Sequence, residues 1–390
     1  MSLLFLIVMI PALALLVVTI WNVGCWPQVA VTGKAERAHS LSILIPARNE
    51  EANLAACLDA ALMQGEVIHE VLVYDDHSSD GTPGIIKEYT RRDLRVRAVA
   101  PQELPAGWCG KTFACARLAS EARGEWLLFL DADARLGANA ATNIIEEAVW
   151  RKVSLLSCWP ALEAGSFWEG ALMPFLNLVV FTLYPAPLAL KRVRDASLGL
   201  AHGSCMLARR DAYNRTGGHS AVREEIFEDV RLAQIWRERG EASLCLDGQR
   251  VVTVRMYGSF SEIWRGFQKN FYPAFRREAS FWSFITLHFM VFLLPFILLP
   301  LFLAGVSAAW PLLVTALCAL AMRTALALRF KQPLWSVLLH PLGESVLIAL
   351  GLSSWWRCKT GRGVEWKGRR YRSGVENYDA LLKGLPDQTK

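Results

Sequence analysis

The sequence lacks the motifs that mark several common protein classes. It has 9 cysteines but no Cys-x-x-Cys pair, and their odd number and irregular spacing indicate neither a disulfide framework nor a zinc site. We interpret most of them as small core residues in a reducing compartment. No Gly-x-Gly-x-x-Gly and no Gly-Lys-Ser/Thr loop follows the first expected strand, which argues against a dinucleotide enzyme and a P-loop NTPase. Ser204 lacks the Gly-x-Ser-x-Gly surroundings of a hydrolase nucleophile.

Charge is also scarce in four long apolar stretches. Residues 3–20 carry none and nearly fill the roughly 20 residues that a membrane span needs, so we predict an N-terminal transmembrane anchor over residues 1–21. A cleaved signal peptide is the alternative. The absence of a basic start and the length of the apolar run argue against it.

Three more apolar stretches, 281–304, 307–328 and 333–354, predict C-terminal membrane segments within residues 281–354. Arg323 lies near the end of the second stretch, where we expect its side chain to reach the interface. The third stretch holds His340 and Glu344 near its middle, together with Pro341 and Gly343. Such residues at membrane depth usually face protein or water, so we expect a re-entrant or interfacial segment there.

Basic residues crowd the segment after the last apolar stretch, although the formal net charge of the chain is only +6. They are Arg357, Lys359, Arg362, Lys367, Arg369, Arg370 and Arg372, offset by Glu365. A juxtamembrane cluster of this kind favours a cytoplasmic tail, here residues 355–390, that attracts anionic lipid rather than nucleic acid. Lys34 and Arg37 place the soluble part in the cytoplasm by the same rule. The chain is therefore expected to be a multi-pass protein of the cell (inner or plasma) membrane, with 333–354 not crossing.

Strands alternate with helices in the soluble part, over about residues 40–260. Short apolar runs predict strands at Ser42–Pro46, Val71–Tyr74, Arg95–Ala100 and Trp126–Leu130. The first run is followed by an expected helix with Asn49, Glu50 and Glu51 in its opening turn, and a second helix is expected over 83–91. This alternation predicts an α/β domain with a mostly parallel sheet covered on both faces.

Carboxylates follow two of these strands. Asp131 and Asp133 come directly after Trp126–Leu130, where open α/β sheets bind ligands, and they suit a hard divalent cation. A solvated turn is the alternative for so short a motif. Asp75 and Asp76 suit hydrogen bonds from a ribose or a base, or a metal, but such residues also form turns and helix caps.

Several segments together resemble family-2 glycosyltransferases of the GT-A fold. They are Ile45-Pro-Ala-Arg-Asn-Glu-Glu, Asp75-Asp-His-Ser-Ser-Asp-Gly-Thr, Gly124-Glu-Trp-Leu-Leu-Phe-Leu-Asp-Ala-Asp, Gly217-Gly218-His219 and Glu228-Asp229. Two further segments, Leu104–Thr112 and Val364–Tyr371, look like a membrane-bound subgroup that includes hopene-associated and carotenoid (diaponeurosporenoate-type) glycosyltransferases. The resemblance implies a GT-A domain with transmembrane helices at both ends.

The resemblance also implies a nucleotide-sugar donor, expected to be a UDP-sugar, and Mg²⁺ or Mn²⁺ as cofactor. Asp133 is then the direct metal ligand, and Asp131 contacts the ribose or a metal-bound water. The implied donor-binding residues are Pro46, Arg48, Glu50, Asp75, Asp76, Lys111 and Asp131, and the family pattern leaves open which of the paired aspartates holds the nucleotide. Lys111 is implied as a phosphate contact, with an exposed lysine at a helix start as the alternative.

By the same resemblance Asp229 is the general base that takes the proton of the acceptor hydroxyl. Acidic residues in a first helical turn are also common for dipole reasons. The expected acceptor side comprises Gly203, Gly218, Glu228 and Trp366. We expect His202 and His219 to be structural, because neither has a metal-ligand partner at useful spacing.

The chain departs from processive family members at Gln268–Tyr272, where Gln-Lys-Asn-Phe-Tyr replaces Gln-x-x-Arg-Trp. We therefore expect a single transfer, with Arg265 or Lys269 as phosphate contacts. The apolar segment 165–190, with Trp168 and Tyr184, predicts an interfacial stretch that brings the site to lipid.

Together with Trp355-Trp356 and the basic tail, this segment favours a site at the cytoplasmic membrane face that takes its substrate from the bilayer. With the resemblance, we expect an inverting, metal-dependent enzyme that acts on a membrane lipid, such as a carotenoid or hopanoid derivative. A polyprenyl-phosphate glycosyltransferase is the first alternative. A non-catalytic membrane scaffold is the second, although intact Asp131, Asp133 and Asp229 argue against it.

Overall fold

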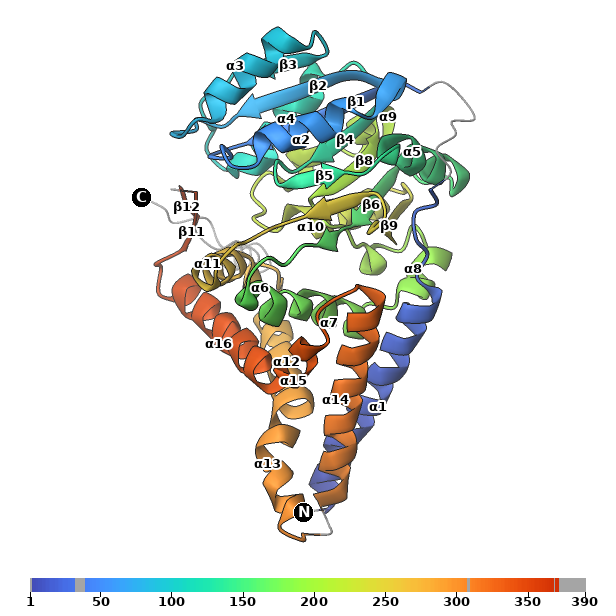
Figure 1. Cartoon of the computed structure of the whole chain (residues 1–390), viewed down its shortest axis with the longest axis vertical. Coiled ribbons are helices and arrows are strands. Elements are labelled where there is room, and N and C mark those ends of the chain that lie inside the picture. The colour runs from blue at the N-terminus through green and yellow to red at the C-terminus, as the bar shows by residue number, and fades with distance from the viewer. Residues whose placement is uncertain (1, 32–38, 307–308, 368, 372–390) are drawn as a thin grey trace, which may run out of the picture. The chain divides into compact units, whose positions relative to one another are not determined.

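The computed structural model describes residues 2–31, 39–306, 309–367 and 369–371 (Figure 1). Lys34, Arg37 and the tail from Arg372 onward, on which the predicted orientation partly rests, lie outside these ranges. The chain divides into two units. The sheet unit comprises Trp26–Glu163 and Leu188–Met256, and the helical unit comprises Met1–Cys25, Ala164–Pro187 and Tyr257–Lys390.

The sheet unit is built on a seven-stranded sheet of order β3-β2-β1-β4-β8-β6-β9. Its strands are β1 (Leu41–Ala47), β2 (Ile68–Asp75), β3 (Val96–Val99), β4 (Trp126–Leu130), β6 (Leu155–Trp159), β8 (Cys205–Arg209) and β9 (Ser243–Asp247). β1, β2, β3 and β4 pair in parallel, whereas β8 is antiparallel to β4 and β6. The mostly parallel α/β sheet predicted from the sequence is confirmed.

A smaller three-stranded sheet of order β5-β10-β7 accompanies the large one. It consists of β5 (Ala134–Leu136), β10 (Val252–Val254) and β7 (Ala161–Leu162). Because β5 begins one residue after Asp133, the turn that carries Asp131 and Asp133 is held between β4 of the large sheet and β5 of the small one.

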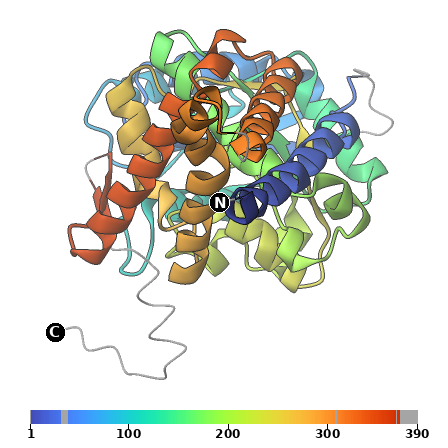
Figure 2. The same cartoon turned by 90° about the horizontal axis from the view of Figure 1, so that it is seen from below.

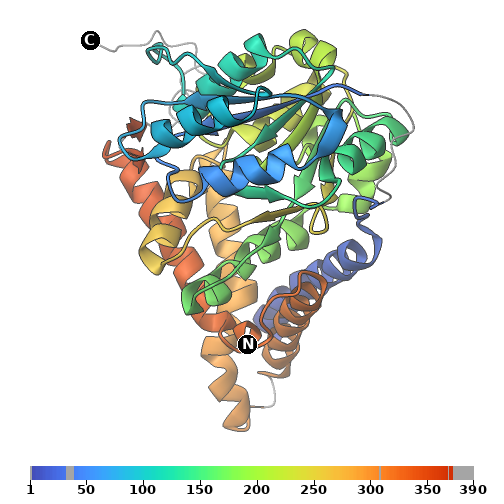
Figure 3. The ribbon, with the colours of Figure 1, turned by 45° about the horizontal axis from the view of Figure 1, so that its top comes forward.

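Alternate residues of β4 enter the two cores of the sheet unit. Leu128 and Leu130 pack in one hydrophobic cluster, and Leu127 and Phe129 pack in the other. Helices α2 (Leu54–Leu62), α3 (Thr82–Arg92) and α5 (Ala140–Trp150) contribute to the first cluster, and α4 (Gly110–Glu121), α9 (Arg210–Arg215) and α10 (Glu228–Glu238) contribute to the second. The layers are visible in Figure 3. A strand buried on both faces has to be apolar throughout, which is why the sequence of β4 is an unbroken apolar run.

The first strand and helix differ in detail from the expectation. β1 continues through Pro46 to Ala47, because a proline late in a strand removes only one donor. Helix α2 begins at Leu54, so Asn49, Glu50 and Glu51 do not form its opening turn. Asn49 instead takes a left-handed conformation with φ of 52°, which starts the loop between β1 and α2.

Three helical segments of the described chain are long and apolar enough to cross a membrane: Phe5–Cys25, Glu278–Leu301 and Trp310–Arg329. They belong to α1 (Ser2–Cys25), to the continuous series α12 (Glu278–Leu287), η4 (His288–Leu293) and α13 (Leu294–Leu303), and to α14 (Trp310–Arg329). Within the helical unit α1 packs along α14 (Figure 2). Apolar helices at both ends of the chain were predicted from the sequence, and they are confirmed.

The remaining elements of the helical unit are shorter or interrupted. They are α6 (Phe167–Leu172), α7 (Pro174–Leu183), α11 (Phe260–Phe271), α15 (Trp335–Leu338), α16 (His340–Lys359), β11 (Val364–Trp366) and β12 (Arg369–Tyr371). Helix α8 (Ala186–Lys191) and the short turns η1 (Gly65–Val67), η2 (Ala196–Leu198) and η3 (Gly218–Val222) complete the chain. The sequence stretch 333–354 thus divides into two helices and is not among the candidate spans.

The apolar segment 165–190 is exposed at its start and buried further on. Phe167 and Trp168 of α6 are 55% and 37% exposed, whereas α7 packs against α1 and α14 within the helical unit. Its placement at a membrane interface stays a prediction. The expectation that Arg323 reaches the membrane interface is wrong. Its side chain is 0% exposed and turns toward Ser336 inside the unit.

Candidate active site

The carboxyl ends of β1, β2 and β4 meet at one edge of the large sheet, because these strands are parallel neighbours. The chain reverses its strand order between β1 and β4, which is where open α/β sheets place their ligand crevices. The start of β8 joins the same edge, since Cys205 pairs with Leu130. Topology therefore brings the polar residues after β4 next to those before β8.

Asp131 points to the face of the sheet covered by α4 and α10. It continues the alternation of Leu127 and Phe129, and its carboxylate meets Lys111 in the first turn of α4. The Lys111 Nζ lies 2.9 Å from Asp131 Oδ1 and 3.0 Å from its Oδ2. The same nitrogen lies 3.0 Å from Oε1 of Glu228, the first residue of α10. One ammonium group therefore bridges two carboxylates from two different elements.

Backbone hydrogen bonds hold the start of α4 where Lys111 can reach these carboxylates. The Cys109 N–H donates to the Arg223 carbonyl at 2.7 Å, and the Thr112 hydroxyl donates to the same carbonyl at 2.9 Å. Burial lowers the pKa of Lys111, but the charges of Asp131 and Glu228 outweigh it and raise that pKa well above its usual value. The lysine therefore stays protonated at neutral pH.

Asp229 follows Glu228 and accepts two backbone hydrogen bonds. The Val230 N–H donates to its Oδ1 at 2.7 Å, and the Gly203 N–H donates to its Oδ2 at 2.8 Å. Burial and the neighbouring Glu228 raise the pKa of Asp229 to about 7, against the opposing influence of Lys111 and of these N–H donors. A carboxylate with this pKa takes up and releases a proton near neutrality, which is what a general base needs.

Gly203 is the point of closest backbone approach to this cluster. A Cβ atom at its position would lie 3.1 Å from Lys111 Nζ and 3.3 Å from Asp229 Oδ2. The small residue expected on the acceptor side therefore has a defined task, because it lets its N–H reach the Asp229 carboxylate.

His202 holds the segment before β8 and does not act as a charged group. Its backbone N–H donates to the Ser157 hydroxyl oxygen at 2.8 Å, and that hydroxyl donates to the His202 carbonyl at 3.1 Å. Its ring Nδ1 lies 2.8 Å from the Ser204 hydroxyl, and burial, with Lys111 adding to it, lowers its pKa to about 3. His202 is thus neutral at physiological pH. Its backbone is held by Ser157, a residue that no sequence motif had indicated.

Gly218 and His219 lie in η3 and pack around Tyr213. A Cβ atom on Gly218 would lie 2.1 Å from Cζ of Tyr213, and the Tyr213 hydroxyl lies 2.9 Å from Nδ1 of the buried His219. Burial lowers the pKa of His219 to about 4. The geometry gives Gly218 a packing task, and its role toward an acceptor stays a prediction. Trp366 lies in β11 of the helical unit, where the structure describes the backbone alone.

The loops after β1 and β2 bind each other at the same sheet edge. Arg48 donates to the backbone carbonyl of Asp76, and the Glu50 N–H donates to the Thr82 hydroxyl at 2.8 Å. Asp75 Oδ1 accepts the Ser78 N–H at 3.0 Å. Asp75 therefore forms the turn that the alternative interpretation expected, and a contact to nucleotide through Asp75 or Asp76, or through Pro46 in β1, stays a prediction.

Asp133 lies two residues beyond Asp131, and its Oδ1 atom is buried. Among the described residues no group of three or more His, Cys, Asp or Glu side chains is arranged to hold a metal ion. A cation at this edge would thus take one or two carboxylates from the chain and its other oxygens from a ligand such as a diphosphate, which is how Mg²⁺ is usually held. The donor set fits such an ion. Lys111 engages Asp131, and the role of Asp133 as the direct metal ligand stays a prediction.

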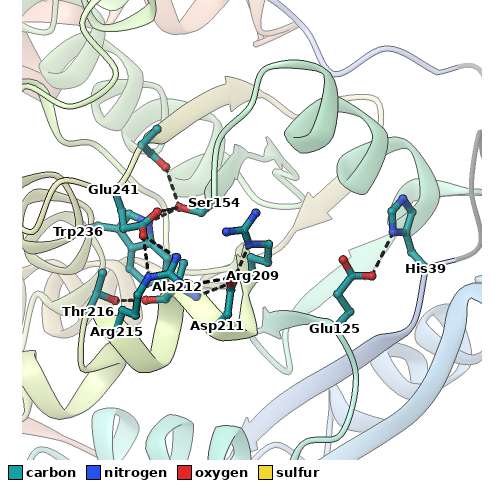
Figure 4. A network of polar contacts seen from close by, with 11 residues as sticks. His39, Glu125, Ser154, Arg209, Asp211, Ala212, Arg215, Thr216, Trp236 and Glu241 are labelled. Carbon is teal, nitrogen blue, oxygen red and sulfur yellow. Dashed lines mark hydrogen bonds and ion pairs between the residues drawn. The ribbon is translucent and has the colours of Figure 1, made fainter.

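The opposite edge of the sheet carries a different polar region, which includes an open surface cavity of about 430 Å³. The cavity is lined by Ser40, Arg123, Glu125, Arg209, Arg210 and Asp211. Figure 4 shows Arg209 paired with Asp211, at 2.6 Å, and Glu125 paired with His39, at 3.3 Å. These exposed pairs lie at the amino ends of β1 and β4, far along the strands from Asp131, and we do not assign them to the active site.

Comparison with known proteins finds a family match and several similar chains. Residues 42–217 match the model of the family described as glycosyl transferase family 2. The chain is 29% identical over 240 residues to a 4,4'-diaponeurosporenoate glycosyltransferase of Staphylococcus haemolyticus (strain JCSC1435), covering 61% of this chain and 62% of the relative. It is 26% identical over 237 residues to the protein of the same name in Staphylococcus aureus (strain USA300), covering 59% and 60%. The chain thus spans about three fifths of the length of the curated relatives it matches.

The fold also resembles a solved structure, that of the mannosyltransferase PcManGT from Pyrobaculum calidifontis in complex with GDP-Man and Mn²⁺. The TM-score is 0.52 at 17% identity, and the match covers 91% of this chain and 99% of the other. At this identity the likeness establishes the fold, which is the expected GT-A fold.

Proposed function

We propose that this chain, whose residues 42–217 form a glycosyl transferase family 2 domain, transfers one sugar from a nucleotide-sugar to a membrane lipid with inversion at the anomeric carbon. The observation that carries the proposal is the cluster at the sheet edge, where the Gly203 N–H holds the Asp229 carboxylate close to the Lys111 ammonium group that bridges Asp131 and Glu228. We expect a UDP-sugar as donor and a terpenoid lipid as acceptor. The names of the two staphylococcal relatives support a carotenoid acid as the first acceptor to try.

In the proposed reaction an acceptor oxygen attacks the anomeric carbon while the bond from that carbon to the diphosphate oxygen breaks. The acceptor proton passes to Asp229, whose Oδ2 is oriented by the Gly203 N–H and whose Oδ1 is oriented by the Val230 N–H. Because one carboxylate takes the proton and no enzyme-bound sugar forms, the anomeric centre inverts. The expected product thus has the opposite anomeric configuration to the donor.

Lys111 has two successive partners in this proposal. Without donor it neutralises Asp131 and Glu228, and with donor bound it faces the negatively charged diphosphate that arrives at the same sheet edge. Asp133, with Asp131 nearby, would hold Mg²⁺ or Mn²⁺, and this ion would stabilise the charge that develops on the leaving diphosphate. Arg48, Asp75 and Asp76 are proposed for the nucleoside end, because they follow β1 and β2 beside β4.

A membrane acceptor is supported by the three apolar helices of the helical unit, which are long enough to cross a bilayer. We propose a multi-pass protein of the cell membrane with its sheet unit in the cytoplasm, where nucleotide-sugars are available. The exposed aromatic side chains of α6, Phe167 and Trp168, suit a membrane interface.

The test is donor turnover by the purified full-length protein in detergent. UDP-glucose, other UDP-sugars and GDP-mannose are offered with extracted membrane lipids, with and without Mg²⁺ or Mn²⁺, and both nucleotide release and glycolipid are measured. We expect metal-dependent release with one donor class and its loss in Asp133→Ala. Asp59→Asn, an exposed aspartate on α2, is the matched control and should behave as wild type. No release and no glycolipid with any donor would refute transfer and favour a non-catalytic scaffold.

A further inference from the structure

Four ionisable side chains lie in the interior of the helical unit, apart from the site described above. Arg323 of α14, His288 at the start of η4, and His340 and Glu344 of α16 are each 0% exposed. Ionisable groups inside a membrane domain are costly, and they persist mainly where they bind a ligand, an ion or one another. Their contacts indicate which of these applies.

Arg323 has fewer polar partners than a buried guanidinium requires. Its Nη2 donates to the carbonyl of Ser336 at 3.3 Å and to the Ser336 hydroxyl at 3.2 Å. Its Cζ lies 4.6 Å from the centre of the Phe175 ring. The Nε and Nη1 atoms are buried and have no hydrogen-bond partner in the part of the chain that the structure describes. Two of its three nitrogens therefore present unused donors.

Glu344 does not supply the missing partner. Its Oε1 accepts a hydrogen bond from His288 Nδ1 at 2.7 Å, and its buried Oε2 has no hydrogen-bond partner among the described residues. His340 directs Nε2 to the Phe292 carbonyl at 3.0 Å and stacks on Phe175, with ring centres 5.7 Å apart. The Phe175 ring thus lies between Arg323 and His340, and the guanidinium meets an aromatic face where a carboxylate would be expected.

The helical series that carries His288 is irregular at the same place. His288–Leu293 is a π-helical segment between α12 and α13, within an otherwise α-helical candidate span. Such segments are rare and occur frequently at functional sites, because the extra residue per turn redirects side chains. Here the segment begins at His288, the residue that engages Glu344. This irregularity is independent of the unpaired Arg323 atoms and marks the same interior.

We propose that Arg323, with Ser336, binds the anionic oxygen head group of a lipid that enters the helical unit. A planar guanidinium with free donors matches a carboxylate or a phosphate in two-point contact, and the apolar helices around it suit a hydrocarbon chain. The bound anion satisfies the unused Nε and Nη1 donors. That this lipid is the acceptor of sugar transfer rests on the function proposed above, whereas the binding itself does not.

The binding test uses the purified full-length protein in detergent without any nucleotide-sugar. Retention of radiolabelled palmitate is measured in competition with unlabelled palmitate, hexadecyl phosphate and hexadecanol, which share one chain length. We expect an anionic probe to compete about tenfold or more better than hexadecanol, the gain expected for charge-assisted hydrogen bonds. Palmitate as the better competitor would identify a carboxylate site, and hexadecyl phosphate would identify a phosphate site. Equal competition by hexadecanol would overturn the proposal, and this comparison needs no variant.

Variants then locate the site. Arg323→Gln should lose the preference for anionic probes, whereas Arg329→Gln, which removes the same charge from the end of the same helix, should keep it. If Arg323→Gln does not fold, Arg323→Lys replaces it and should retain the charge but weaken the preference. Unchanged preference in a folded Arg323 variant would also overturn the proposal. Glycolipid formation without anionic-lipid binding would refute this site and leave the proposed function standing. Anionic-lipid binding without glycolipid formation would support this site and refute the proposed function.

Discussion

The backbone N–H of Gly203 donates a 2.8 Å hydrogen bond to Oδ2 of Asp229, although the two residues are far apart in the sequence. Gly203 lies just before β8, at the sheet edge where Asp131 follows β4, and Asp229 lies in the first turn of α10. The bond joins the carboxylate proposed as the base to the sheet edge proposed for the donor. It also explains why residue 203 has no side chain, since a Cβ there would lie 3.3 Å from that oxygen.

Replacing Asp229 removes the proposed base. Asp229→Asn is expected to lower sugar transfer by about 10²–10⁴-fold and to leave donor binding unchanged. Transfer is measured as labelled glycolipid, and binding is measured separately by titration with the nucleotide-sugar. Because asparagine has one carbonyl oxygen for the two N–H donors of Gly203 and Val230, thermal unfolding is followed as a check on folding. Wild-type turnover in a folded variant would remove Asp229 from the mechanism.

The pH dependence of transfer follows from the raised pKa of Asp229. A base with a pKa of about 7 is ionised above that pH, so kcat/KM should rise through neutrality and level off on the alkaline side. At one pH unit below the pKa the rate should be about one tenth of the plateau, because about one tenth of the base is ionised there. A rate that is flat between pH 5.5 and 8 would contradict the assignment.

The two charged neighbours of Asp229 should move this profile in opposite directions. Glu228 raises the pKa of Asp229, so Glu228→Gln should shift the rising limb to lower pH. Lys111 lowers that pKa, so Lys111→Gln should shift the limb to higher pH and also weaken donor binding. The control is Glu238→Gln at the exposed end of α10, which should leave the profile in place. Shifts of the same sign in both variants would show that the limb reports another group.

Gly203→Ala tests the close approach between the chain before β8 and the cluster. The added methyl group would press on Lys111 Nζ at 3.1 Å and on Asp229 Oδ2 at 3.3 Å, so transfer should fall about 10–100-fold through misplacement of the base. The matched control is Gly84→Ala in α3, where the added Cβ meets nothing within 4 Å. The control should keep full activity. Equal activity in both variants would show that the site tolerates the shift.

Gly218→Ala tests a packing task instead. The residue has φ of 48°, and the new Cβ would lie 2.1 Å from Tyr213, so the free energy of unfolding should fall by about 2–4 kcal/mol. Chemical denaturation of the purified protein in detergent measures this, with Gly84→Ala again as reference. Full stability with impaired acceptor binding would support the acceptor role predicted from the sequence.

The apolar runs and the residues that interrupt them made the large features predictable. The unbroken apolar run Trp126–Leu130 predicted a strand buried on both faces, and helices do cover both faces of the large sheet at this strand. The apolar helices at the two ends of the chain could also be predicted from the sequence, because a run of 18 or more apolar residues has few other stable arrangements. Asp131 and Asp133 could be named as candidates because they directly follow such a run, whereas Asp229 was named through the resemblance to family-2 glycosyltransferases.

The sequence by itself determined which carboxylates and glycines are available, and it placed them at strand and helix ends through local periodicity. Only the tertiary structure decided that Lys111 would bridge Asp131 and Glu228, that Gly203 would hold Asp229, and that burial beside Glu228 would raise the pKa of Asp229 to about 7. It also turned Arg323 into the interior of the helical unit, where the sequence had suggested the interface. Such contacts join segments separated by tens of residues, and no local pattern encodes them, because they depend on strand order and on how the helices pack over the sheet.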